Sequence, residues 1–426
     1  MSCSTGGTPS PIVSSGKFVA SGVASQMKDR AFFRDNYRPA LDDLRWLVGP
    51  EARPWLDQLV NVHDPSVAQV ANLRRSLPPE RARLVLEQAL LRRRAREKFS
   101  HADEMFFTAV ALEQATDEQV AAYKASRFPH SQPLLDLCCG IGGDLSALAE
   151  RGKLDAFDLD PATVLLAAAN CPATHVEIGD ACTAHVENYA AWHIDPDRRA
   201  SGRRTTQLAG YQPPLAVLDE LLARNASAAI KLAPATEPPP EWLAAAHREW
   251  ISRDGQCRQL VAWFGALAFA PGGKSATVLR SSNSEPFTIS IADGVATDPR
   301  VAERIGCYVF EPDAAVLAAR LTGVLAARFE LAAVAAGIGY LTADHPVDCP
   351  ALQVFKVCEV LPLDVRRLKA WLRERGIGRL EVKKRGVDIE PESLRRRLNV
   401  GGDNAATLVI TPHQGRIVAI IAQRVH

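Results

Sequence analysis

The chain has 426 residues, of which 47% are hydrophobic and 23% are charged, and its formal net charge is +1. A chain of this length is too long to fold around a single hydrophobic core, and this composition excludes a disordered chain. We therefore expect a folded protein of two or three domains. Its longest apolar stretches are interrupted by charged residues or glycine before the roughly 20 residues that a membrane helix requires, which argues against a membrane protein.

The first 28 residues are rich in serine and glycine and contain no continuous apolar segment of the signal-peptide kind. We expect a disordered tail over 1–28 rather than a targeting sequence, and we therefore expect the protein in the cytoplasm. The nine cysteines lack paired C-x-x-C spacing, which argues against a disulfide framework and against a structural zinc site. No metal is expected, and the sequence leaves the oligomeric state open.

Residues 29–130 show helical periodicity and few strand signals. Within them, Pro78 and Pro79 open the segment PPERARLVLEQALLRRRAREK in the way that a helix begins. The sequence therefore predicts an N-terminal helical region over 29–130.

From residue 131 the pattern changes to short β-rich runs, several of them separated by helical segments: PLLDL, LDAFD, HVEIG, AAWHI, AAIKL, QLVAWF and SATVL. Strands that alternate with helices predict a doubly wound α/β domain with a parallel sheet over 131–307. After residue 308, helices mix with strands in an α+β order that ends in an antiparallel pair, which predicts a separate small domain over 308–426.

A glycine-rich turn follows the first of these strands, in PLLDLCCGIGGD. Asp136 ends the strand, and Gly140, Gly142 and Gly143 form the turn before a helix. Glycine lets a ligand approach the backbone closely and adopts dihedral angles that side chains disfavour. The dinucleotide fingerprint G-x-G-x-x-G is incomplete because Cys138 occupies the place of its first glycine, so the turn alone does not identify the ligand.

Acidic residues follow the next two strands. Asp158 ends the second strand, where a carboxylate accepts hydrogen bonds from ribose hydroxyls. Asp180 follows the third strand, where it is placed to meet an adenine amino group while the amide of Ala181 reaches a ring nitrogen. Any one of these acids can be a helix cap, and Asp160 before Pro161 is expected to be one. Together with Asp136 they predict one acidic crevice at the strand tips. An acidic crevice suits S-adenosylmethionine, which has a sulfonium and no phosphate, better than a dinucleotide.

The series DLCCGIGGD, AFDLDP, GDA and HIDPDRR resembles the class I S-adenosylmethionine-dependent methyltransferases. The segments REKFS, EQATDEQVAAYKA, AAIKLAP, YVFEPDAAVLAA and VKKRG with ESLRRRL are similar to a bacterial branch with a helical leader and a C-terminal THUMP-like domain. This resemblance extends over residues 80–426, and Cys138 departs from the commonest family pattern. It implies a Rossmann-like seven-stranded methyltransferase sheet, an RNA substrate, and a cofactor site formed by Asp136, Cys138, Gly140, Gly142, Gly143, Asp144, Asp158, Asp180 and Ala181.

The reaction centre is expected at the end of the fourth strand, in WHIDPDRR. Methyl transfer is an in-line displacement, so the protein has to orient a lone pair and accept any released proton. Asp195, with the backbone at Pro196, is placed for both tasks. Enzymes that methylate exocyclic amines typically have proline and an aromatic residue next, whereas this chain has Asp197 and Arg198. Base stacking on the Arg198 plane stays open, as do a ring nitrogen, a carbon or a ribose oxygen as the target.

We expect Arg198 to contact a substrate phosphate, the alternative being an ion pair with a neighbouring aspartate. Two other polar residues lie on predicted strands of this domain. His193 is expected to be a buried core residue. Lys231 either neutralises the crevice acids or caps its strand, and it ranks second to Asp195.

Basic residues are clustered in the outer regions, as RRRAREK, RRLKAWLRER, KKR and RRR, whereas acidic residues outnumber basic ones over 131–307. A single cluster is commonly a solvated helix face, but several together favour a polyanionic partner such as RNA. The residues expected to contact nucleic acid, with a solvated face as the alternative, are Lys383, Lys384, Arg385, Arg395 and Arg396.

Three hypotheses follow from the sequence. In the first, the chain is an RNA methyltransferase whose flanking basic domains grip the substrate. In the second, it methylates a small molecule or a protein, which predicts binding that is insensitive to salt. In the third, it is a catalytically inactive nucleic-acid-binding protein that has kept the fold.

Overall fold

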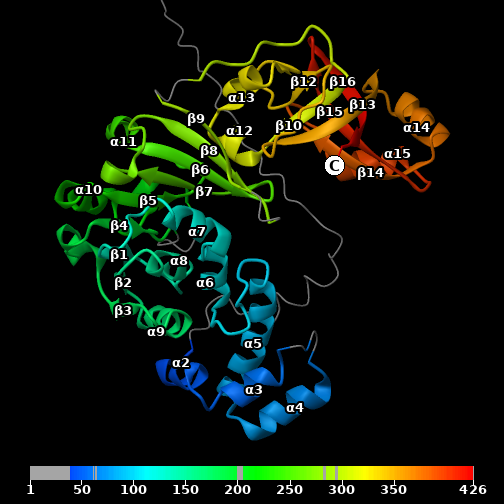
Figure 1. Cartoon of the computed structure of the whole chain (residues 1–426). Helices are drawn as coiled ribbons and strands as arrows, with labels where there is room; N and C mark the ends of the chain where they lie inside the picture. Colours follow the sequence, from blue (N-terminus) through cyan, green and yellow to red (C-terminus); the bar gives the residue numbers. More distant parts are fainter. Residues whose placement is uncertain are drawn as a thin grey trace, which may run out of the picture.

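The computed structural model describes residues 39–60, 62, 65–198, 205–281, 285–292 and 296–425. The tail expected at 1–28 lies outside these residues. A helical region, a central sheet with helices around it, and a second sheet follow one another along the molecule (Figure 1). No helix in the described part of the chain is long and apolar enough to cross a membrane.

The leading region is helical, as predicted. Its helices are α2 (Leu41–Val48), α3 (Arg53–Asp57), α4 (Val67–Ser76), α5 (Pro79–Ala95), α6 (Ala109–Gln114) and α7 (Glu118–Ala125). Pro79 occupies the first turn of α5. Proline fits there because an N–H at this position has no hydrogen-bond acceptor within the helix. Ser66 and Gln69 form a capping box that begins α4. The apolar core of this region extends onto the central domain, because it includes Ile141 and Leu166.

The central sheet has nine strands in the order β3-β2-β1-β4-β5-β7-β6-β8-β9. Strands β3, β2, β1, β4 and β5 are parallel, and β7 is antiparallel to β5. The strands are β1 (Leu134–Leu137), β2 (Leu154–Asp158), β3 (His175–Ile178), β4 (Ala191–Ile194), β5 (Ala228–Leu232), β6 (His247–Arg253), β7 (Gln256–Trp263), β8 (Lys274–Leu279) and β9 (Phe287–Ile291). The connecting helices are α8 (Leu145–Ala149), α9 (Pro161–Asn170), α10 (Leu215–Arg224) and α11 (Pro240–Ala245), with short 3₁₀ turns η1 (Ala181–Thr183), η2 (Val186–Asn188), η3 (Leu208–Gly210) and η4 (Gly265–Leu267). The fold class is confirmed, and the sheet exceeds the expected seven strands by β6 and β9.

Strand β6 lacks the apolar pattern of a buried strand because its centre carries a buried carboxylate. Glu249 is 0% exposed and accepts hydrogen bonds from Tyr123 Oη (2.6 Å) and Trp263 Nε1 (2.9 Å). It also forms an ion pair with Arg127 (2.9 Å). A buried charge with this many partners is satisfied without water. Helix α7 is thereby tied to the far half of the sheet.

A second sheet has seven strands in the order β11-β12-β10-β13-β16-β15-β14. They are β10 (Tyr308–Pro312), β11 (Ala332–Ala333), β12 (Leu341–Ala343), β13 (Leu352–Pro362), β14 (Ile377–Lys384), β15 (Asn404–His413) and β16 (Arg416–Arg424). The last two strands form the expected antiparallel pair. The helices here are α12 (Ala314–Ala318), α13 (Thr322–Arg328), α14 (Val365–Glu374) and α15 (Pro391–Leu398). Helix α12 packs on β6, β7 and β8, so the two sheets share one core.

Candidate active site

One cavity of about 900 Å³ opens at the carboxyl ends of β1, β2 and β4. Carboxyl ends of parallel strands meet at one edge of a sheet, which explains why residues distant in sequence gather there. The expected site residues that line it are Asp136, Cys138, Gly140, Gly143, Asp144, Asp158, Asp195, Pro196 and Arg198. Gly142, Asp180 and Ala181 are not among its lining residues.

The glycine turn adopts the backbone that its sequence predicts. Gly140 and Gly142 have φ values of +57° and +89°, which glycine adopts at little cost. Cys138 also has a positive φ, +53°, although it has a side chain. Burial raises the pKa of the Cys138 thiol well above its usual range, and the surrounding aspartates add to this effect. The thiol at the cavity wall is therefore neutral and a poor nucleophile.

Asp158 lies beside this turn and orders it. Its Oδ2 accepts a hydrogen bond from the Gly140 amide (3.0 Å), and its Oδ1 accepts one from the Asp160 amide (3.0 Å). Each carboxylate oxygen has a second lone pair, so Asp158 can still accept hydrogen bonds from a ligand. Asp160 caps α9 through the Thr163 amide, as expected.

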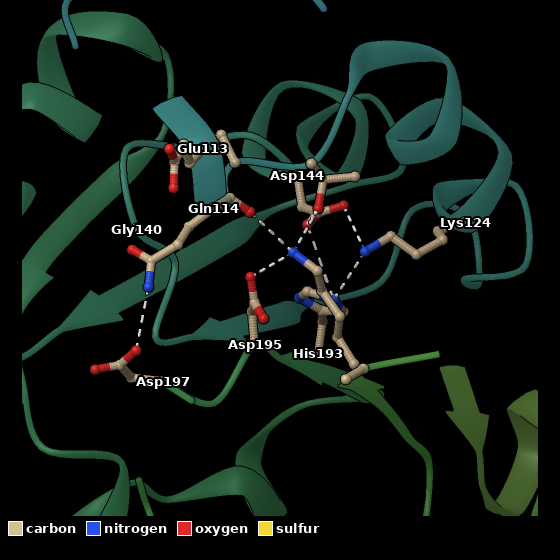
Figure 2. A network of polar contacts seen from close by, with 12 residues as sticks. Glu113, Gln114, Lys124, Gly140, Asp144, His193, Asp195 and Asp197 are labelled. Atoms are coloured by element: carbon tan, nitrogen blue, oxygen red, sulfur yellow. Dashed lines mark hydrogen bonds and ion pairs between the residues drawn. The ribbon is translucent and has the colours of Figure 1, made fainter. Parts of the chain in front are cut away.

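A chain of buried polar groups connects the acids of the cavity, and Figure 2 shows its central part. The Lys231 ammonium contacts Asp195 Oδ2 (2.5 Å) and the Thr116 hydroxyl (3.0 Å). Thr116 contacts Asp144 Oδ2 (2.7 Å), and the other Asp144 oxygen pairs with Lys124 (2.7 Å). These contacts join the end of β4 to the start of α8 through the segment between α6 and α7.

The network of polar contacts extends from Lys124 through His193 to Asp136 on the first strand. Lys124 Nζ lies 3.2 Å from His193 Nε2, and His193 Nδ1 lies 2.6 Å from Asp136 Oδ1. Because an ammonium only donates, Nε2 accepts and Nδ1–H donates to Asp136, which fixes the His193 tautomer. His193 is buried, as expected, but it is also a member of this network. Asp136 faces the cavity with one oxygen already bound to His193.

Electrostatics keeps Asp144 ionised in this buried place. Burial alone would raise the pKa of Asp144, but the charges of Lys124 and Lys231 outweigh it and hold the pKa well below its ordinary value. For Asp136 burial dominates and raises the pKa, with His193 opposing it. The two carboxylates at the inner wall thus differ in their affinity for protons.

The segment after Asp195 lies against the leader. Asp197 Oδ1 accepts a hydrogen bond from Gln114 Nε2 (3.1 Å), and Asp197 pairs with Gln212 in an isolated bridge. Arg198 is half-buried and lines the cavity. The arginines at 199 and 203–204 lie outside the described residues.

Known proteins are similar to this chain in sequence and in fold. Two S-adenosylmethionine-dependent methyltransferases of Mycobacterium tuberculosis, both named as uncharacterized, are 34% identical over 346 residues, 78% of this chain and 93% of theirs. The chain belongs to this methyltransferase family. Residues 352–424 match the family described as THUMP domain-like, and residues 40–95 match a domain of unknown function. A crystal structure from Porphyromonas gingivalis W83, assigned as a methyltransferase, has the same fold, with a TM-score of 0.71 at 21% identity over 91% of this chain and 98% of that one.

The cofactor of this methyltransferase family is S-adenosylmethionine, and the cavity fits it. The left-handed turn at Gly140 leaves open space where a side chain would stand, since nothing lies within 4 Å of a Cβ built there. Asp158 keeps acceptor capacity for ribose hydroxyls. Leu159 and Ile178, near Asp158 and Asp180, are 69% and 60% exposed, but they are not among the residues that line the cavity.

Asp180 has a local role in the methyltransferase. Its side chain is exposed and accepts a hydrogen bond from the Cys182 amide (2.9 Å), which caps η1. This hydrogen bond lowers the pKa of Asp180. Ala181, next to it, is buried. The contact of these two residues with adenine stays a prediction.

The leader forms one wall of the methyltransferase cavity. Residues from α5 and α6 line it, among them Arg83, Glu87 and Ala109. Burial raises the pKa of Glu87, which Arg83 opposes. Periodicity identified these helices in the sequence, but it did not indicate which of their side chains face a cavity.

The basic residues predicted to bind nucleic acid fall into two groups in the terminal domain. Lys383 and Arg385 both pair with Glu311, at 2.7 and 3.1 Å, so their charges are engaged inside the protein. Lys384 is half-buried, and Arg395 pairs with Glu392 on its own helix. Arg396 is exposed.

Helices α14 and α15 pack against each other, and both carry exposed arginines. Besides Arg395, which pairs with Glu392, the exposed arginines are Arg366, Arg367 and Arg373 on α14 and Arg396 and Arg397 on α15. We call these five residues the arginine face. Within the described residues none of them forms an ion pair, which leaves their charge available to a partner.

Proposed function

We propose that this protein transfers a methyl group from S-adenosylmethionine to RNA. The observation that carries this proposal is the THUMP-like domain, with its arginine face, in the same chain as a methyltransferase cavity. Arginine binds phosphate in a bidentate manner, and exposed arginines without acidic partners are suited to a nucleic-acid backbone. In this proposal the chain consists of a leader (29–130), a methyltransferase domain (131–307) and a terminal domain (308–426). The leader and the terminal domain carry the basic clusters that bind the substrate, and the methyltransferase domain carries the acidic crevice.

The roles of the residues follow from the cavity. The cofactor, when bound, supplies a methyl group that is activated for attack by a nucleophile. Asp158 accepts hydrogen bonds from the ribose, and the turn at Gly140 and Gly143 lets the ligand approach the backbone. Asp195, at the tip of β4, accepts a hydrogen bond or a proton from the methyl acceptor. Arg198 contacts the substrate beside it, as a planar cation against a base or a phosphate.

Cofactor binding is tested by calorimetric titration with S-adenosylmethionine. We expect Asp158→Ala to weaken binding by roughly 10- to 100-fold, because it removes charged acceptors of two hydrogen bonds. Circular dichroism and thermal melting of the variant show whether it still folds. If a folded Asp158→Ala protein binds the cofactor as tightly as wild type, the assignment of Asp158 is wrong.

The RNA substrate is tested with radiolabelled S-adenosylmethionine and RNA isolated from a strain that lacks this gene. We expect label in RNA, and RNA affinity that falls steeply as salt rises. Replacing Arg366 and Arg396 together by glutamine should reduce the salt slope by about two, one for each phosphate contact. The matched control is Arg304→Gln, because Arg304 is an exposed arginine already paired with Asp344. Label that enters protein or small molecules but not RNA would refute the proposed substrate.

A further inference from the structure

Lys231 uses all of its hydrogen-bonding capacity inside the network. Its ammonium contacts Asp195 Oδ2 (2.5 Å), Thr116 Oγ1 (3.0 Å) and the Gln114 carbonyl oxygen (3.3 Å). An ammonium group has three N–H donors, and three acceptors surround it here. The Lys231 side chain is only 8% exposed, so it does not present its charge to solvent.

The hydrogen bonds around Lys231 have a single consistent direction. Asp144 is ionised and accepts only, so the Thr116 hydroxyl donates to Asp144 Oδ2 and accepts from Lys231. Lys124 holds the other Asp144 oxygen. The buried ion pair of Asp144 and Lys124 therefore holds Lys231 through the Thr116 hydroxyl, and the position of Lys231 does not depend on Asp195 alone.

Asp195 is held on one side only. Lys231 engages its Oδ2, and among the described residues no hydrogen bond engages its Oδ1. The Asp195 side chain is 26% exposed and lines the cavity. The geometry thus leaves one carboxylate oxygen, at a fixed position, for a group that enters the cavity.

We propose that Lys231 is a positioning residue for methyl transfer: it holds Oδ2 of Asp195 so that Oδ1 meets the N–H or O–H of the methyl acceptor. This inference rests on the proposed function. In-line displacement demands an acceptor atom aligned within a few tenths of an ångström, and misplacement by about 1 Å can cost 10²-fold in rate. Lys231 acts on the rate through Asp195 and does not touch the substrate.

A double-mutant cycle separates positioning from a structural role. The four proteins are wild type, Lys231→Met, Asp195→Asn and the double variant, compared in single-turnover methyl transfer to RNA at saturating cofactor. We expect Lys231→Met to slow transfer about 100-fold with cofactor affinity changed less than about threefold. We expect the double variant to be no slower than Asp195→Asn alone. Additive losses, or a Lys231→Met rate close to wild type, would overturn the proposal.

Thr116 offers a milder pair of variants in case Lys231→Met does not fold. Thr116→Val keeps the side-chain shape but removes the hydroxyl that anchors Lys231, and Thr116→Ser keeps the hydroxyl. We expect Thr116→Val to slow transfer about tenfold and Thr116→Ser to slow it less. Equal rates for the two folded variants would show that the hydroxyl link has no part in positioning Asp195.

A crystal structure of Lys231→Met, or of Thr116→Val, with S-adenosylhomocysteine makes the test independent of the substrate. We expect the Asp195 carboxylate to leave the place it has in wild type. If it stays, the positioning role is refuted whatever the assay shows. If wild type methylates no RNA but the carboxylate moves, the proposed substrate fails while the role of Lys231 stands.

Discussion

At the scale of single residues, Asp144 shows how a buried charge connects separate elements of the structure. It receives Lys124 on one oxygen and Thr116 on the other, and its side chain is 8% exposed. Removing one partner of a buried pair leaves the other charge uncompensated, which costs more than the pair itself contributes. The anchor behind Lys231 therefore depends on Asp144 being ionised.

We predict that Asp144→Asn lowers the free energy of unfolding by about 3 kcal/mol at neutral pH. The folded-state pKa of Asp144 lies below its unfolded value, so its stabilising contribution is complete above a pH of about 4. It is lost as the pH falls through the lower folded-state pKa. Urea denaturation from pH 7 to pH 3 should show the difference between the two proteins shrinking in acid.

The control for this prediction is Asp160→Asn. Asp160 caps α9, and asparagine caps helices about as well as aspartate, so a change below about 0.5 kcal/mol is expected. A difference between Asp144→Asn and wild type that stays constant with pH would contradict the ionised state of Asp144.

The sequence predicted part of this network and not the rest. Asp136 and Asp195 were predicted because each lies at a strand tip, in a pattern that brings strand tips together, and Asp144 because the family resemblance implied it at the cofactor site. Lys124 and Thr116 come from the leader, and their contacts arise from tertiary packing, which leaves no local pattern in the sequence. Lys231 was noticed at the end of its strand, but only the structure shows that it contacts Asp195.

At the scale of elements, the glycine turn and the α6–α7 connection fit against each other without room for a side chain. A Cβ on Gly143 would lie 2.8 Å from the Thr116 nitrogen and 2.9 Å from its oxygen. Thr116 in turn anchors Lys231. The close approach of two backbones therefore sets the position of the network at the reaction centre.

We predict that Gly143→Ala lowers the free energy of unfolding by about 1–3 kcal/mol and weakens cofactor binding, because the turn and Thr116 must move apart. Gly140→Ala is the matched variant. It meets nothing within 4 Å, and only its positive φ costs about 1 kcal/mol. Thermal melting compares the two, and Gly140→Ala is a control for stability only, because Gly140 lines the cofactor cavity. A Gly143→Ala protein as stable as Gly140→Ala would show that the α6–α7 connection moves without a loss of stability.

The burial and polarity of each strand explain which strands could be predicted from the sequence. Strands β1, β4 and β5 are fully buried and mostly apolar, and such runs between turn signals predict strands directly. Strand β6 was missed because His247, Glu249 and Ser252 are polar and buried, each through partners from other elements. Strand β9 alternates apolar residues, among them the buried Ile289, with exposed Thr288 and Ser290; this alternation is a strand signal that the sequence analysis overlooked.

At the scale of the whole molecule, the second sheet is joined to the first by packing as well as by the chain. Val316 and Leu321 belong to the same apolar core as Trp250 and Val278 of the central sheet. Figure 1 shows α12 and α13 between the two sheets. Because α12 covers strands β6, β7 and β8, the terminal region completes the central domain and also carries the arginine face.

We predict that a chain ending at residue 307 aggregates, because it exposes the face of β6, β7 and β8 that α12 covers. Each large apolar side chain left uncovered costs about 1.5–3 kcal/mol, and a contiguous apolar patch drives association. Size-exclusion chromatography and cofactor titration of the shortened and full-length chains measure the effect. A monomeric shortened chain that binds S-adenosylmethionine would show that the two sheets are independent, and the arginine face would then act as a tethered module. If the shortened chain aggregates, the terminal region that carries the arginine face is packed rigidly against the methyltransferase sheet. The distance between the arginine face and the cavity is then fixed, and it limits which position of a bound RNA receives the methyl group.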